Sequence, residues 1–228
     1  MNGGGRPRRG SVKVCGITHP ADARAALRAG ADLIGLIFSR SPRRVEADDA
    51  ARWLPELRGE FPDALVCGVF LPEDAGGVLE TSSRLSLDVI QYHGSPAPDP
   101  ILESGWPVLE TRRPRGEGEG AIPLDPRLFG LLADTFDRDR EGGTGTAFPW
   151  AWVAGWSASC RLFLSGGLGP DNVAGAIETV APFGVDASSR LESRPGRKDP
   201  ARVRDYIETA RAAFDRLPKD GGLEERTT

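Results

Sequence analysis

Residues 11–38 read SVKVCGITHPADARAALRAGADLIGLIF, and this segment sets the pattern for the whole chain. The runs Val12–Cys15 and Leu33–Phe38 are largely apolar at consecutive positions, which is typical of parallel strands buried on both faces. Between them, Pro20–Ala29 has apolar residues at helical spacing and follows Thr18, a residue suited to capping a helix. The segment therefore predicts a strand, a helix and a second strand parallel to the first.

The same alternation of apolar runs and helical segments continues along the chain. Six more runs predict strands: Leu65–Phe70, Asp88–Gln91, Pro107–Glu110, Phe129–Leu132, Leu162–Leu164 and Phe183–Asp186. The last helical segment is the clearest, because an apolar stripe runs between Pro200 and Pro218. The stretch Arg112–Pro126, rich in Gly, Pro and charge, predicts a short helix or none. Eight such units in 228 residues predict an α/β fold, a single (β/α)8 TIM barrel.

The chain has no internal linker long enough to divide it into domains. We predict a disordered N-terminal leader at residues 1–10, the barrel catalytic domain at residues 11–217 and a polar C-terminal tail at residues 218–228. The leader carries arginines, but no apolar segment follows them, so it does not resemble a secretory signal. No apolar run approaches the roughly 18 residues that a membrane helix needs, so no membrane partner is expected.

The charge and the cysteines narrow the class of protein further. The net charge of -4 argues against nucleic acid as a partner but leaves room for a small phosphorylated substrate. The chain has three cysteines, Cys15, Cys67 and Cys160. The number is odd, and no two of them form a C-x-x-C pair. A disulfide framework and a structural zinc site are therefore not expected, and a reducing compartment, the cytoplasm, is. The sequence is compatible with a monomer or a homodimer.

In a (β/α)8 barrel the active site lies at the C-terminal ends of the strands, so the residues after each apolar run are candidates. Two glycine clusters, Gly142–Gly145 and Ser165–Gly167, lie in such positions. Glycines let backbone N–H groups converge on an anion, and a helix behind them, here predicted at Pro170–Val180, adds a favourable dipole. Tight turns alone would explain one cluster, but two clusters and a serine pair favour phosphate. The candidates are Gly143, Gly145, Ser165, Gly166, Gly167, Ser188 and Ser189.

Two residues are candidates for proton transfer. Cys15 ends the first predicted strand, where it is either a packed small residue or, with a lowered pKa, a competent base. Asp134 directly follows the sixth strand and must leave the core toward the site. Asp186 lies inside the last apolar run, where a carboxylate needs hydrogen bonds, and we expect it to brace the turn at Ser188.

Arg43 and His93 are the remaining candidates. Arg43 follows the second strand and is suited to bind a carboxylate or a phosphate. His93 follows the fourth strand and is either a structural hydrogen-bonding group or part of the pocket lining. No second His, Cys or acid stands at ligand spacing from it, so no metal site is predicted.

The ordered set of motifs resembles the phosphoribosylanthranilate isomerase family. Lys13–Thr18 is similar to the family's opening K-x-C-G-I-T. Further similar segments are Gly35–Phe38, Ser41–Arg43, Val69–Phe70, Gln91–Gly94, Asp134, Gly142–Gly145 with Phe148 and Trp150, Ser165–Leu168 with Asn172–Val173, Gly184–Ser189, Glu192, Pro195–Gly196 and Lys198–Asp199. The resemblance runs from about residue 12 to residue 215, and it is the order of the pieces that makes it specific.

The resemblance implies an aldose-ketose isomerase of tryptophan biosynthesis. Such an enzyme converts N-(5-phosphoribosyl)anthranilate to 1-(o-carboxyphenylamino)-1-deoxyribulose 5-phosphate by an Amadori rearrangement. It implies that Asp134 is the general acid, that Cys15 is the general base and that Arg43 holds the anthranilate carboxylate. The glycine clusters and the serine pair would hold the phosphate. No cofactor and no metal are implied, because the substrate nitrogen supplies the electron sink.

One departure from the family pattern matters, and two alternatives stay open. The family has Gly after its serine pair, where this chain has Arg190. Arg190 either strains a position that favours glycine or contacts the phosphate itself. The alternatives are a paralogous barrel acting on another phosphorylated aminoaldose and a non-catalytic barrel that binds a sugar phosphate. The presence of Cys15 and Asp134 argues against a non-catalytic barrel, because a protein that only binds a sugar phosphate needs neither residue.

Overall fold

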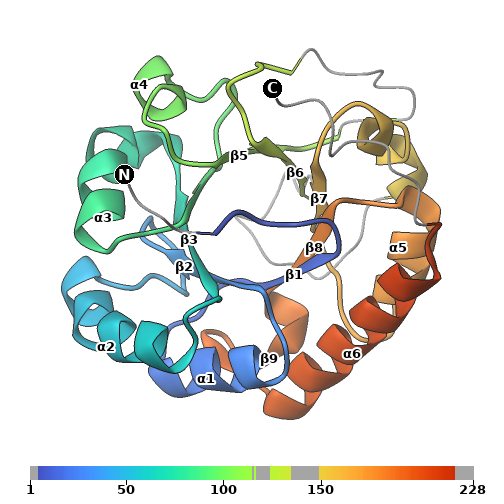
Figure 1. Ribbon diagram of the computed structural model, residues 1–228, viewed down its shortest axis with the longest axis horizontal. Helices are drawn as coiled ribbons and strands as arrows, with labels where there is room; N and C mark the ends of the chain where they lie inside the picture. Colours follow the sequence, from blue (N-terminus) through green and yellow to red (C-terminus); the bar gives the residue numbers. More distant parts are fainter. Residues whose placement is uncertain (1–4, 115, 117–123, 135–148, 219–228) are drawn as a thin grey trace.

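The computed structural model describes residues 5–114, 116, 124–134 and 149–218. Eight parallel strands, hydrogen-bonded in chain order, close into a barrel, and the helices surround it (Figure 1). The pairing of β8 with β1 closes the barrel and places Asp186 opposite Lys13. The predicted single (β/α)8 TIM barrel is confirmed. Its strands are β1 Ser11–Val14, β2 Leu33–Ile37, β3 Leu65–Phe70, β4 Val89–Tyr92, β5 Val108–Arg112, β6 Gly130–Ala133, β7 Leu162–Leu164 and β8 Gly184–Ala187.

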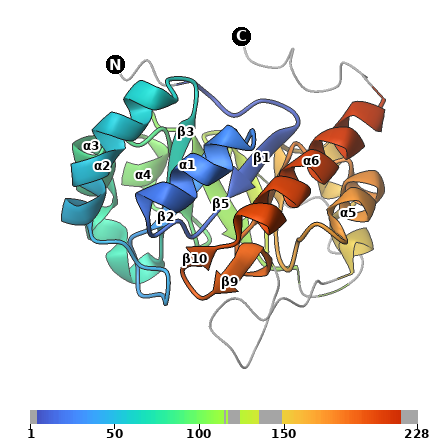
Figure 2. The same cartoon turned by 90° about the horizontal axis from the view of Figure 1, so that it is seen from below.

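Helices and a small hairpin complete the described part of the chain. The α-helices are α1 Pro20–Arg28, α2 Ala47–Glu60, α3 Val78–Arg84, α4 Asp99–Leu102, α5 Val173–Val180 and α6 Pro200–Arg216. The 3-10 helices are η1 Pro72–Gly77, η2 Trp150–Val153, η3 Trp156–Ala158 and η4 Ser189–Leu191. β9 Glu192–Arg194 and β10 Arg197–Lys198 form an antiparallel hairpin after β8. Figure 2 shows this hairpin at the end of the barrel toward which the strands point, beside α6.

The helix starts differ from the sequence prediction at two places. His19, not Thr18, caps α1, because its ring Nδ1 accepts the N–H of Ala21 at 3.2 Å. Helix α5 begins at Val173, three residues after the predicted start at Pro170. The loop before it is instead fixed by hydrogen bonds of the Asn172 side chain. Among the described residues between β5 and β6, none is helical, in line with the short or absent helix expected there.

Apolar side chains form two layers, one inside the barrel and one between the barrel and the helices. Side chains alternate between the two faces along a strand, so neighbouring residues of one run belong to different layers. On β1, Val12 and Val14 pack outward in the outer layer, whereas Cys15 belongs to the inner cluster. The inner cluster also holds Leu33, Leu65, Cys67, Val69, Val89, Leu109, Phe129, Leu132 and Phe163. The barrel interior is therefore a packed apolar core below its polar mouth.

The end of the barrel where the strands begin is tied together by one carboxylate. Asp32 accepts the N–H of Val12 at 2.8 Å and pairs with Arg211 at 2.5 Å and Arg8 at 3.3 Å. Gly10 donates to the carbonyl of Phe183 at 2.8 Å, so the last residues of the predicted leader contact the barrel. Of the helices within the described ranges, none has the length and apolar character needed to cross a membrane.

Candidate active site

The alternation of strand faces brings polar side chains from four strands to the upper interior of the barrel. On β1, Lys13 lies on the same face as Cys15, and on β4 Gln91 lies on the same face as His93. Lys13 confirms this arrangement, because its ammonium reaches Gln91 Oε1 at 2.8 Å and Asp186 Oδ2 at 3.0 Å. Residues distant in the sequence thus meet around one cation.

The Lys13–Asp186 ion pair lies entirely inside the barrel. Its two side chains are 0% and 5% exposed. Isolated buried charges are very costly, so each ion needs the other. Asp186 was expected to brace the turn at Ser188, and that prediction is wrong, because its Oδ2 is bound by Lys13 instead. Asp186 Oδ1 is buried and has no hydrogen-bond partner in the described structure, which leaves an acceptor facing the site.

Hydrogen bonding fixes the protonation of His93. Gln91 Oε1 accepts from Lys13, so the amide nitrogen of Gln91 is the donor in its 2.7 Å contact with His93 Nε2. His93 Nε2 is therefore the acceptor, and the proton of the neutral ring is on Nδ1. Burial, with the positive charges of Arg113 and Lys13, lowers the pKa of His93 to about 3. His93 is a neutral hydrogen-bonding group of the interior at physiological pH.

Cys15 lies above a gap left by a glycine on the neighbouring strand. A Cβ atom built on Gly35 would lie 2.7 Å from Cys15 Sγ and 3.1 Å from Cys15 Cα. Only a residue without a side chain leaves room for the sulfur at this place. Burial raises the pKa of the Cys15 thiol, and the Lys13 charge acts against this increase. The glycine that begins the family motif Gly35–Phe38 is therefore explained by the space that Cys15 needs, which the sequence did not reveal.

Asp134 continues the inward face of β6. Its N–H donates to the carbonyl of Arg112 at 2.9 Å, so the ladder with β5 extends to this residue. Leu132, two residues earlier, belongs to the inner cluster, and Asp134 therefore lies on the interior side at the strand end. Burial is the largest effect on the pKa of Asp186 and raises it, whereas Lys13 lowers it. The negative charge of Asp134 is a smaller effect that also raises this pKa. Cys15 also interacts electrostatically with Asp186, so acid and thiol share one neighbour.

The Ser165–Gly167 turn has the backbone geometry of an anion-binding loop. Gly166 and Gly167 both take positive φ, +85° and +68°. Asn172 braces the loop, since its amide donates to the Gly167 carbonyl at 2.9 Å and its Oδ1 accepts the Gly169 N–H at 2.8 Å. Behind the loop, α5 begins. The other glycine cluster, with Gly143 and Gly145, lies outside the described residues.

Arg190 braces this loop from η4, which follows β8. It donates to the Gly167 carbonyl at 3.1 Å and pairs with both carboxylate oxygens of Asp171, at 2.9 and 2.7 Å. Among the described non-glycine residues, only Ser86 and Ala181 have positive φ. Arg190 therefore causes no backbone strain in place of the family's glycine. Its guanidinium supports the turn from the side, and Ser189 begins η4 just before it.

Arg43 lies at the mouth, held by a carboxylate of the hairpin. Its Nε and Nη2 bind the two oxygens of Glu192 at 2.7 and 2.8 Å. Lys198, almost fully buried, pairs with the same carboxylate at 3.0 Å and donates to the Ser188 carbonyl at 3.1 Å. A Cβ built on Gly16 would lie 2.7 Å from both Arg43 Cδ and Ser188 Oγ, so these groups crowd one spot above β1.

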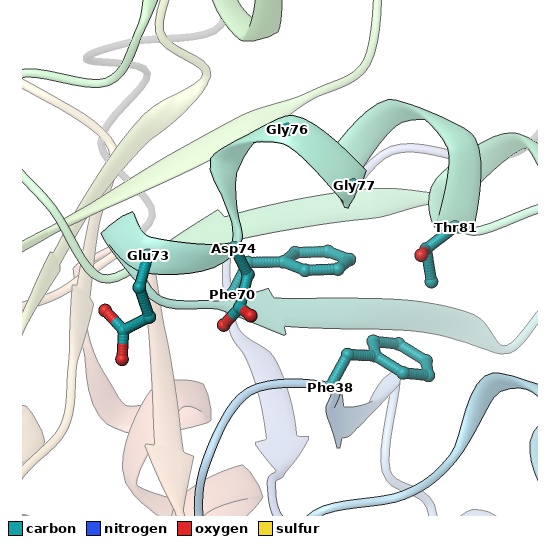
Figure 3. Close-up of a pocket in the computed structure, with 7 residues that line it drawn as sticks. All are labelled: Phe38, Phe70, Glu73, Asp74, Gly76, Gly77 and Thr81. Atoms are coloured by element: carbon teal, nitrogen blue, oxygen red, sulfur yellow. The ribbon is translucent and has the colours of Figure 1, made fainter.

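A separate pocket lies outside the barrel interior, between β3 and the segment that follows it (Figure 3). The rings of Phe38 and Phe70 stack there with centroids 5.4 Å apart, and Glu73, Asp74 and Thr81 also line it. Phe70 packs with the outer layer of the core, and Cys15 is not among the residues that line the pocket. None of the predicted site residues that the structure describes lines it.

Comparison with known proteins gives the family. The family model described as N-(5'phosphoribosyl)anthranilate (PRA) isomerase matches residues 12–209. The chain belongs to the phosphoribosylanthranilate isomerase family. It is 37% identical over 201 residues to the N-(5'-phosphoribosyl)anthranilate isomerase of Pelobacter propionicus, which covers 88% of this chain and 95% of that one.

Solved phosphoribosylanthranilate isomerases have the same architecture. The enzyme from Thermotoga maritima is 31% identical, with a TM-score of 0.74, and the match covers 89% of this chain and 98% of that one. A second structure of this kind, a complex with reduced 1-(o-carboxyphenylamino)-1-deoxyribulose 5-phosphate, is also 31% identical, with a TM-score of 0.71 and the same coverage of both chains.

Within this phosphoribosylanthranilate isomerase fold, the structure gathers most of the residues that the sequence singled out. Cys15, Asp134, His93 and Asp186 belong to the barrel interior, and Arg43 and Ser188 lie at its mouth beside them. Sequence reasoning gave no role to Lys13, Gln91, Glu192 or Lys198. The signal for Lys13 was present, since a lysine within an apolar strand needs an acid on a facing strand. Within the described ranges, no three His, Cys, Asp or Glu residues are grouped to hold a metal.

Proposed function

We propose that the chain catalyses the Amadori rearrangement of N-(5-phosphoribosyl)anthranilate to 1-(o-carboxyphenylamino)-1-deoxyribulose 5-phosphate in tryptophan biosynthesis. One observation carries the proposal: a thiol just after β1 and a carboxylate just after β6 continue the inward faces of their strands, and both interact electrostatically with Asp186. Membership of the family supports the same conclusion, as does the likeness to an isomerase in complex with the reduced product.

Asp134 and Cys15 divide the proton transfers between them. Asp134 donates a proton to the furanose ring oxygen, and the C1′–O bond breaks to give a protonated Schiff base. The Cys15 thiolate then removes the C2′ proton, and the electron pair moves toward the nitrogen to form the enolamine. The enolamine tautomerises to the ketone. The substrate gains one proton and loses one, so the enzyme is reset when a proton passes through solvent from Cys15 to Asp134.

Arg43 has a free edge for the anthranilate carboxylate. A guanidinium carries five N–H donors, and Glu192 engages Nε and one hydrogen of Nη2. The Nη1 hydrogens and the second Nη2 hydrogen remain on the opposite edge, in the fork geometry that binds a carboxylate through both oxygens. Glu192 thus aims the guanidinium, and Arg43 is able to bind Glu192 and the substrate at the same time.

The phosphate is assigned to the loops after the last strands. Gly166 and Gly167 expose backbone N–H groups in front of α5, and Ser165, Ser188 and Ser189 add hydroxyls. Gly143 and Gly145 complete the proposed set from the sequence motif alone. No step draws on a cofactor or a metal, because the substrate nitrogen accepts the electrons.

Turnover of phosphoribosylanthranilate by the purified chain tests the activity directly. The rearranged product is separated from the substrate by chromatography and quantified over time. We expect saturable turnover. Saturable binding of the substrate without turnover would overturn the assignment in favour of a sugar-phosphate-binding barrel. Turnover restricted to another phosphorylated aminoaldose would identify a paralogous isomerase.

Arg43→Lys is expected to raise KM by about 10–100-fold with kcat nearly unchanged, since a charge-assisted hydrogen bond contributes about 1.5–3 kcal/mol. Lysine has a point charge and no fork, so Glu192 retains it and the substrate carboxylate loses its partner. Steady-state kinetics measures the effect. Arg44→Lys is the matched control, because Arg44 is half-exposed and pairs only with Glu46 among the described contacts. An unchanged KM in Arg43→Lys would contradict the assignment.

We further propose that the enzyme works in the cytoplasm as a monomer or a homodimer. All three cysteines are free thiols, which fits a reducing compartment. Light scattering on the eluting protein distinguishes the two oligomeric states.

A further inference from the structure

Lys13 is a buried cation that none of the assigned roles uses. It lies two residues before Cys15 on the inner face of β1, and its side chain is 0% exposed. Its ammonium contacts Asp186 Oδ2 at 3.0 Å and Gln91 Oε1 at 2.8 Å. Successive residues of a strand alternate between its two faces, so Lys13 and Cys15 lie on the same side of β1. An ammonium has three N–H donors, and Asp186 and Gln91 account for two of them.

Stability does not explain an ion pair at this place. Below its mouth the barrel interior is filled by apolar side chains, and apolar residues of similar volume often stabilise a core as well as a buried ion pair does. A perturbed buried charge beside a reactive group is typical of a functional site. A fixed positive charge on the same strand face as the Cys15 thiol gives the ion pair a function that apolar packing cannot supply.

We propose that Lys13 is a positioning residue for catalysis, whose fixed ammonium on the inner face of β1 stabilises the thiolate form of Cys15. This inference rests on the proposed role of Cys15 as general base. Asp186 and Gln91 hold the ammonium in place, so the position of its charge is fixed before substrate binds. Lys13 touches no reacting atom of the substrate and acts only through the thiol.

The charges around Cys15 have opposing effects, and Lys13 has the largest favourable one. Burial raises the pKa of the thiol, Lys13 lowers it, the Asp186 carboxylate raises it, and Lys198 lowers it. Arg43, in the loop after β2, and Cys67, on β3, also interact electrostatically with Cys15. Burial alone would lower the pKa of Lys13, but Asp186, Cys15 and Cys67 raise it above its ordinary value. Lys13 therefore stays charged while the thiol titrates.

The test is the pH titration of the Cys15 thiolate in four proteins: wild type, Lys13→Met, Asp186→Asn and the double variant. Thiolate absorbance in the ultraviolet is measured as the difference between each protein and its Cys15→Ser counterpart, so Cys67 and Cys160 cancel. We expect the lowest midpoint in Asp186→Asn, then wild type, and the highest in Lys13→Met, by about one pH unit or more. The double variant should lie between the two single variants.

The design separates this proposal from misfolding and from the proposed function. Lys13→Met leaves the Asp186 charge unpaired and is the variant at risk of unfolding. In that event the double variant, whose methionine and asparagine are neutral, is compared with Asp186→Asn, and the two differ only at Lys13. Equal midpoints in either comparison would overturn the proposal. The titration needs no substrate, so a missing effect of Lys13 on the thiolate is distinguished from a failed base assignment, which would appear as retained turnover in Cys15→Ser.

Discussion

Cys15→Ser is expected to lower kcat by about 10²–10⁴-fold while the barrel stays folded, the range of a lost general base. A serine hydroxyl occupies nearly the same volume above Gly35, and Lys13 keeps Asp186 and Gln91 as partners. The hydroxyl, however, is far too weakly acidic to exist as an anion at neutral pH, so no base faces C2′. Steady-state turnover gives kcat, and a thermal melt verifies the fold.

The matched control for this variant is Cys160→Ser. Cys160 is also buried, but it packs in the outer layer and its sulfur contacts the Trp156 carbonyl at 3.4 Å. We expect the kcat of this variant to stay within about twofold of wild type. Cys160 lies in the outer layer, away from the barrel mouth, and its surroundings tolerate a side chain of similar volume. Wild-type turnover in Cys15→Ser would remove the thiol from the mechanism.

The architecture was predictable because its signals are local. Each strand is a short apolar run, and each run is buried on both faces by the interior and by the helices. The eight predicted runs match the eight strands to within about one residue at most ends. The position of the site followed as well, since the closed parallel barrel places every strand end at one mouth. Cys15 and Asp134 needed no tertiary information to be singled out.

Side-chain partners were harder to predict because they depend on register across strands. Nothing local to Asp186 reveals that it faces Lys13, which lies at the other end of the chain and pairs with it only when β8 closes on β1. We therefore predicted that Asp186 braces the turn at its sequence neighbour Ser188, and this prediction was wrong. The Glu192 clamp on Arg43 likewise spans 149 residues of sequence.

Arg190 is a second residue whose side-chain partner could not be predicted from the sequence. The sequence offered backbone strain or a phosphate contact, because the family has glycine there. The structure shows no backbone strain at Arg190, and Asp171 receives the guanidinium through both oxygens while the side chain supports the Gly167 carbonyl. Arg190, which replaces the family's glycine, thus has a partner, Asp171, that only the fold brings close to it.

Asp134→Asn is expected to lower kcat by about 10²–10⁴-fold with little change in KM, because a general acid acts in the transition state and not in ground-state binding. Asparagine keeps the shape of the side chain and the ladder bond of its N–H to Arg112. Its amide is able to donate a hydrogen bond to the ring oxygen but cannot release a proton to it. The C1′–O bond then has no acid to assist its cleavage.

The pH profile shows whether the lost group was the acid. In wild type, turnover should fall at high pH as the acid is lost and at low pH as the thiolate is lost, giving a bell shape. In Asp134→Asn the high-pH limb should disappear, and the residual activity should instead rise with pH as the Cys15 thiol ionises. Asp125→Asn is the control, since Asp125 precedes β6 at the opposite end of the strand and pairs with Arg127. A bell that survives unchanged in Asp134→Asn would assign the proton donor to another residue.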